Sequence, residues 1–142
     1  MAKVAKHTLK LEDDFNYDLV GIYCPQSDYR LCWNINEALG LFLSKSDEPY
    51  MVSGKKSTVS SAHSFYEWYD KENQVNYYLI KNKDGVNFLI PEERQTDYFL
   101  VIQESGMVEI NTLLMHLKQI PSILAASILN PNTLKSSKNL IF

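Results

Sequence analysis

Residues 86–102 read VNFLIPEERQTDYFLVI, and they contain two apolar runs separated by a polar loop. Both runs are rich in β-branched and aromatic residues, a composition typical of strands. Pro91 lacks a backbone N–H and fixes φ, so it ends the first run. The stretch therefore predicts two strands, at 86–90 and 97–103, joined by the loop within residues 90–98.

Three further strands are predicted around this stretch. Asp84-Gly85 indicates a tight hairpin, because such a turn needs positive φ and glycine allows it. Two aromatic-rich strands precede it at 64–69 and 75–80, and another apolar strand lies near the N-terminus at 19–24. The middle of the chain is therefore expected to form a meander of strands.

Two helices are predicted from apolar residues that recur on one face. The first begins at Ser27 or Asp28, whose side-chain oxygen can accept a hydrogen bond from an exposed amide, and ends near Gly40. The second opens at Ser105 or Gly106 and is stopped by the next proline. Their apolar positions are Leu31, Cys32, Ile35, Leu39 and Phe42 in the first helix and Val108, Leu113, Leu114, Leu117 and Ile120 in the second.

The remaining segments complete one α+β domain spanning residues 1–142. Residues 122–129 are apolar on both faces, which predicts a central strand. An alternating pattern at 7–12 predicts a short strand, residues 44–60 a polar loop, and residues 130–142 a C-terminal tail that docks by its apolar end. We expect an antiparallel sheet with two helices on one face, nearest to a ferredoxin-like plait with an extra hairpin.

The composition narrows the functional classes. With 142 residues, 45% of them hydrophobic and 22% charged, the chain matches a soluble globular domain. Its net charge of −3 argues against a nucleic-acid partner, because such proteins usually carry a basic field. The sequence shows neither a membrane-spanning apolar run nor the apolar region of a signal peptide. We therefore expect a cytoplasmic protein with no nucleic-acid or membrane partner.

No cofactor or metal is expected from the sequence. Its five glycines are too widely separated for a phosphate-binding loop. His7, His63 and His116 stand apart, without the spacing of a metal site. Cys24 and Cys32 match neither a disulfide framework nor a metal knuckle, so reduced thiols are expected. Cys24 precedes the first helix, where the pKa of a thiol can be lowered, but a buried structural thiol is the favoured interpretation.

The polar loop contributes three candidate site residues, Glu92, Asp97 and Tyr98. Two carboxylates can act as acid and base, yet here they can also accept loop amides or pair with an arginine, and that structural interpretation is favoured. Arg30 lies in the first turn of the first helix, where the helix dipole opposes its charge. We hypothesise that Arg30 pairs with Glu92 or Asp97. The candidate binding residues are thus Arg30, Glu92, Asp97 and Tyr98, and none is assigned as catalytic.

An aromatic set lies on two neighbouring predicted strands: Tyr66, Trp68, Tyr69, Tyr77 and Tyr78. Such rings could stack on single-stranded RNA, but cross-strand aromatic pairs also stabilise sheets. Without basic residues between them, the structural interpretation is favoured. If several of the rings are exposed together, they indicate a dimer interface.

Three pieces of the sequence carry a resemblance to a known family. They are YDLVGI at 17–22 with DYRLCWNIN at 28–36, YYLI at 77–80, and IPE followed by DY within 90–98. Together they resemble the IPExxxDY family of small bacterial proteins over nearly the whole chain. Four residues separate Glu from Asp here, whereas the family name implies three. The resemblance implies a shared fold and transfers no catalytic or binding residue.

Taken together, the sequence predicts a non-enzymatic domain that binds a partner protein or itself, as a homodimer. The alternative is a small-molecule-binding module with its ligand near Arg30, Asp97 and Tyr98. A third hypothesis is a hydrolase that uses Glu92 or Asp97.

Overall fold

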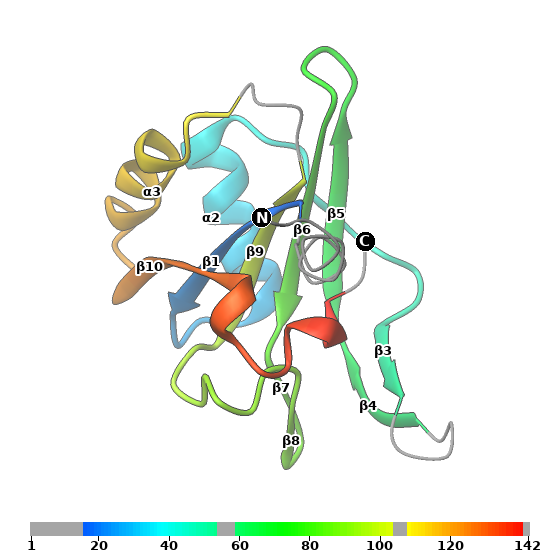
Figure 1. Cartoon of the computed structure of the whole chain (residues 1–142). Coiled ribbons are helices and arrows are strands. Elements are labelled where there is room, and N and C mark those ends of the chain that lie inside the picture. Colours follow the sequence, from blue (N-terminus) through cyan, green and yellow to red (C-terminus); the bar gives the residue numbers. More distant parts are fainter. Residues whose placement is uncertain (1–15, 54–58, 104–107, 141–142) are drawn as a thin grey trace, which may run out of the picture.

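The computed structural model describes residues 16–53, 59–103 and 108–140. It is an α+β fold built on a six-stranded sheet whose neighbouring strands run antiparallel (Figure 1). The elements are β1 (Asp18–Tyr23), α2 (Asp28–Leu39), β2 (Ser44–Lys45), β3 (Tyr50–Ser53), β4 (Val59–His63), β5 (Phe65–Asp70), β6 (Val75–Lys81), β7 (Lys83–Asp84), β8 (Asn87–Phe88), β9 (Tyr98–Gln103), α3 (Ile110–Lys118), β10 (Ala125–Leu129), and the 3-10 helices η2 (Pro131–Thr133) and η3 (Ser137–Asn139).

The strand order of the main sheet is β10-β1-β9-β6-β5-β2, and β3–β4 and β7–β8 form separate two-stranded sheets. Strands β1, β5, β6 and β9 lie where the sequence predicted strands. Each helix joins two strands that are not neighbours, α2 between β1 and β2 and α3 between β9 and β10. The two helices contact each other and lie side by side in Figure 1.

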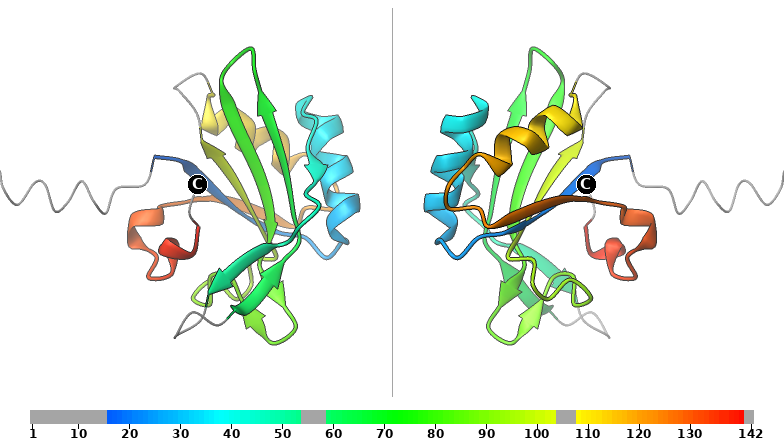
Figure 2. Two further views of the ribbon diagram at one scale, coloured as in Figure 1. Left: turned by 90° about the vertical axis from the view of Figure 1, so that its right-hand side faces the viewer. Right: turned by 90° about the vertical axis from the view of Figure 1, so that its left-hand side faces the viewer.

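Two apolar cores are separated by the sheet. Buried residues of both helices, including Ile35 and Leu117, belong to the first core. The second core includes Leu140 of the C-terminal segment. Figure 2 shows α2 and this C-terminal segment on opposite sides of the sheet. Strand β9 contributes Leu100 to the first core and Val101 to the second, which explains its unbroken apolar sequence.

The ends of the helices follow local sequence signals. Helix α2 begins at Asp28 and ends at Leu39, and the following Gly40 has a φ of 70°, the left-handed conformation that glycine adopts without strain. Helix α3 begins at Ile110, later than expected, because Glu109 accepts hydrogen bonds from the first free amides, Asn111 N at 2.9 Å and Thr112 N at 3.2 Å. The cap expected at Ser105 or Gly106 lies outside the described residues.

The structure corrects three predictions about strands. Residues 122–129 do not form a central strand, because β10 stands at the edge of the sheet. Within 86–90 only β8 pairs as a strand, although the following residues Leu89 and Ile90 are buried. Residues 44–60 are not one loop, since they contain β2, β3 and the beginning of β4. The strand predicted at 7–12 lies outside the described residues.

Candidate functional site

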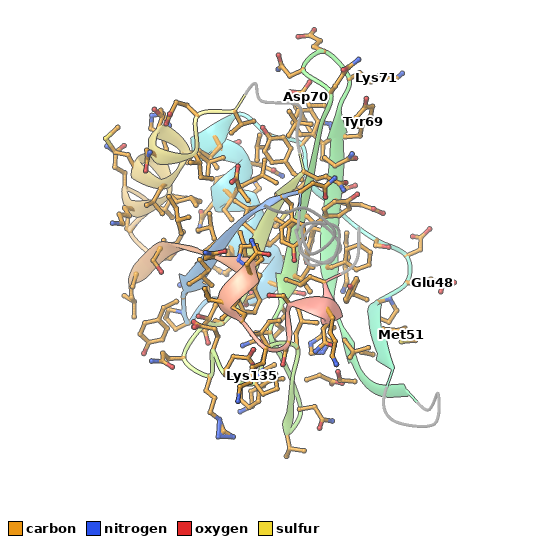
Figure 3. All side chains as sticks on the ribbon, in the orientation of Figure 1. Glu48, Met51, Tyr69, Asp70, Lys71 and Lys135 are labelled. Carbon is orange, nitrogen blue, oxygen red and sulfur yellow. The ribbon has the colours of Figure 1, made fainter. Side chains whose placement is uncertain are left out.

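Glu92 of the polar loop binds the C-terminal segment. Its Oε2 accepts the Ser136 amide at 2.6 Å, and its Oε1 accepts the Ser136 hydroxyl at 2.8 Å. Partial desolvation alone would raise the pKa of Glu92, but these hydrogen bonds and the charge of Lys135 hold it below its usual value. Lys135 projects from the C-terminal segment in Figure 3. The Glu92 carboxylate therefore joins the polar loop to the C-terminal segment, which is far from it in the sequence.

Asp97 and Tyr98 bind the turn between β1 and α2. Asp97 Oδ2 accepts the amide of Cys24 at 2.8 Å, and the Tyr98 hydroxyl donates to the carbonyl of Gln26 at 2.6 Å. Burial, followed by the nearby charge of Asp28, raises the pKa of the Tyr98 phenol. Both side chains thus hold the entry to the first helix in place.

Asn82 organises the same loop, and sequence reasoning missed it. The residue is fully buried. Its side-chain nitrogen donates to the carbonyls of Glu93 at 2.9 Å and Thr96 at 2.8 Å, and its oxygen accepts the Ile90 amide at 2.9 Å. Its own backbone N–H donates to the Asp97 carbonyl at 2.9 Å. In the sequence it lies in the polar run 81–85 and reads as a solvated turn residue.

The predicted ion pair of Arg30 with Glu92 or Asp97 is wrong. Each carboxylate has a different partner, Ser136 for Glu92 and the Cys24 amide for Asp97. Arg30 lies on the exposed side of α2, and no ion pair joins it to another residue in the part of the chain that the structure describes. In the first turn of α2 it is Asp28 that binds another segment: its Oδ2 accepts the Ser64 hydroxyl at 2.7 Å, between β4 and β5.

Arg30 belongs to an exposed aromatic surface. A hollow of about 390 Å³ is lined by Tyr29, Arg30, Trp33 and Asn34, which we call the Arg30 surface. Tyr29 and Trp33 are each 64% exposed, and their spacing of four residues places them on one side of the helix. Asn34 donates to the Ser122 hydroxyl at 3.2 Å, which fixes this part of α2 to the segment before β10.

The aromatic set on β5 and β6 is mostly packed. Trp68 stacks on Tyr77 with ring centroids 5.6 Å apart, and Phe42 meets Trp68 edge-on at 5.4 Å. Tyr66 is buried, whereas Tyr69 is exposed at the tip of the hairpin (Figure 3). These contacts support the structural interpretation of the set.

Other hollows lie elsewhere on the part of the molecule that the structure describes. One of about 650 Å³ is lined by residues of β3 and η3 with Phe65, and one of about 370 Å³ lies between α2 and α3 beside Glu37 and His116.

Cys24 and Cys32 are free and buried, and burial raises the pKa of Cys32 to about 11. Within residues 16–53, 59–103 and 108–140, no group of three or more His, Cys, Asp or Glu side chains could hold a metal ion.

Comparisons with known proteins return no relative. No family model, no curated protein and no solved structure matches this chain. No helix among the described residues is long and apolar enough to cross a membrane.

Proposed function

We propose that this chain is a non-enzymatic protein-interaction domain and that the Arg30 surface binds its partner. The observation that carries the proposal is the guanidinium of Arg30, which has no ion pair among the described residues and lines one hollow together with two rings that are each 64% exposed. Tyr, Trp and Arg are the residue types that contribute most binding energy at protein interfaces. An exposed group of these residue types is therefore a candidate interaction site.

The proposed partner presents a carboxylate within an apolar segment. The planar fork of Arg30 suits a carboxylate, which it can hold by two parallel hydrogen bonds. The rings of Tyr29 and Trp33 offer apolar area beside it at little cost in side-chain entropy. A partner with both features would pair with the Arg30 guanidinium and bury the rings of Tyr29 and Trp33 together.

A non-enzymatic role is favoured by the contacts of the polar loop. A general acid or base must reach the proton that it transfers. Both oxygens of Glu92 accept from Ser136, and the Tyr98 hydroxyl donates to a backbone carbonyl. These groups hold segments of the chain together, so the hydrolase hypothesis receives no support from them.

The strand order of the main sheet supports a ferredoxin-like arrangement. In the order β10-β1-β9-β6-β5-β2, the hairpin β5–β6 separates β9 from β2. Without that hairpin the order is that of a ferredoxin-like plait with both helices on one face, and we propose this architecture together with membership of the IPExxxDY family. The free thiols of Cys24 and Cys32 support a reducing, cytoplasmic location.

A peptide-display selection tests the proposal. A random peptide library is selected on the wild-type protein, and the enriched peptides are then measured on Arg30→Ala and on Arg94→Ala. Arg94 is a matched control, because it is also an exposed arginine beside an aromatic ring, with its guanidinium 5.2 Å from the Phe88 centroid. We expect peptides that combine Asp or Glu with apolar residues and that lose at least tenfold in affinity on Arg30→Ala only. Peptides without carboxylates, or equal binding to both variants, would contradict the proposal.

A second candidate function is binding of a small carboxylate ligand at the same surface. The hollow of about 390 Å³ falls within the usual range of ligand pockets, about 300–1,000 Å³. It is lined by Arg30 but by neither Asp97 nor Tyr98, so a ligand there would contact only one of the three residues that the sequence predicted. A thermal-shift series of aromatic carboxylates, with the corresponding amides as controls, tests it. Stabilisation by the acids that Arg30→Ala abolishes would favour this function, and no shift would reject it.

A further inference from the structure

Among the described residues, no strand pairs with the outer edge of β10. β10 is the terminal strand of the sheet, and β1 is its neighbour on one side only. Alternate residues of an antiparallel strand direct their backbone N–H and C=O groups to each side, so part of the β10 backbone faces away from β1. The right-hand view of Figure 2 looks onto the side of the molecule where β10 lies.

The sequence of β10 carries none of the usual protection against edge pairing. Residues 122–129 read SILAASIL, with no charge, no proline and no glycine. Leu124 is 61% exposed and Ile128 is 41% exposed. Natural proteins usually guard an exposed edge with lysine, proline, a bulge or a very short strand.

The opposite edge of the same sheet shows that protection. Strand β2 has only two residues, Ser44 and Lys45, both exposed. A two-residue edge with a lysine offers little template for another chain. The two edges therefore differ in the feature that controls pairing, although they belong to one sheet.

We propose that β10 pairs antiparallel with β10 of a second copy of this chain, which joins the two sheets across a two-fold axis. An antiparallel pair of identical strands is self-complementary, as a two-fold interface requires. Because the strand is uncharged, no like charges face each other across the axis. A second copy also supplies the missing hydrogen-bond partners and covers Leu124 and Ile128. This interface goes beyond the proposed function and does not use the Arg30 surface.

The size of the interface sets the expected strength. Two five-residue strands alone bury less than the roughly 1,200–2,000 Å² of a standard stable interface. Helix α3, which packs against β10, exposes Met115 and can add apolar area. The dimer is accordingly expected to depend on concentration.

Light scattering of the full chain with one charged variant tests the pairing. At high concentration the wild-type mass should approach twice 16.4 kDa and fall toward 16.4 kDa on dilution. Ser127→Lys adds a charge at an exposed position of β10 and should be monomeric. Val86→Lys adds the same charge at an exposed position in the β7–β8 turn and should remain dimeric. A wild-type monomer at every concentration, or a Ser127→Lys dimer, would overturn the proposal.

Amide hydrogen exchange on the wild-type protein decides the question even if Ser127→Lys fails to fold. Amides of β10 should exchange more slowly at high concentration than at low concentration, whereas those of β2 should exchange equally at both. Protection of β10 at every concentration in a monomeric protein would mean that another segment of the same chain covers the edge, and would overturn the proposal. Equal and fast exchange of β10 at both concentrations would do the same.

Discussion

Replacing Asn82 by alanine should be among the most destabilising single changes in this protein. The side chain is fully buried and makes three hydrogen bonds, to the carbonyls of Glu93 and Thr96 and to the amide of Ile90. Alanine removes all three and leaves the Ile90 amide and the Thr96 carbonyl without these partners, whereas the Glu93 carbonyl keeps its bond from the Thr96 amide. Each of the three losses costs about 1–1.5 kcal/mol, so the free energy of unfolding should fall by about 3–4.5 kcal/mol.

That loss is a large fraction of the stability of an ordinary domain, about 5–15 kcal/mol. Urea unfolding followed by tryptophan fluorescence measures it, because Trp68 stacks on Tyr77 in the folded protein. The control is Asn132→Ala, since Asn132 is exposed in η2 and its change should stay within about 0.5 kcal/mol. Asn82→Asp should not rescue stability, because a carboxylate oxygen would face the two carbonyls where the amide nitrogen now donates. A loss below about 1 kcal/mol in Asn82→Ala would refute the role of Asn82 as the organiser of the loop.

Three other changes have expected outcomes that urea unfolding can check. Arg30→Ala should alter stability by less than about 0.5 kcal/mol, because Arg30 is exposed and makes no ion pair among the described residues, and a larger loss would reveal a structural role. Glu92→Gln should remove part of the acid dependence of stability, because folding lowers the pKa of Glu92. The ionised Glu92 therefore stabilises the fold at pH values above its unfolded-state pKa, and this stabilisation is lost as the pH falls through its folded-state pKa. Burial lowers the pKa of His63, so as the pH drops the unfolded state takes up the His63 proton before the folded state does. The free energy of unfolding should therefore fall below about pH 6.5, and His63→Gln should reduce this dependence on pH.

Local patterns in the sequence were sufficient for the elements with strong periodicity. The apolar spacing and Gly40 located α2, and the aromatic-rich composition of 64–69 and 75–80 located the hairpin β5–β6. Each of these signals acts within a few residues, where sterics and side-chain burial decide the conformation. The sequence predicted that α3 opens at a small residue, Ser105 or Gly106. The residue that caps the helix is Glu109, whose side chain is longer than those of the residues preferred at this position.

The contacts of the candidate site were harder to predict because they join segments far apart in sequence. Asn82 and Glu92 bind groups up to 44 residues away, and no motif or residue spacing in the sequence predicts either contact. The charge of Arg30 suggested a partner, but Asp97 accepts the Cys24 amide, and Glu92 accepts the amide and the hydroxyl of Ser136. The binding role of Arg30 stays a prediction, and the structure shows only that its side chain is exposed.

The mistaken placement of residues 122–129 leads to the strongest physical argument for self-association. A strand that is apolar on both faces is typical of the centre of a sheet, where neighbours cover it on every side. Here that sequence stands at an edge, where Leu124 and Ile128 remain 61% and 41% exposed. Pairing with a second copy would turn the same strand into one of the two central strands of a continuous sheet. The sequence pattern and the position in the fold then agree, which they do not in a single chain.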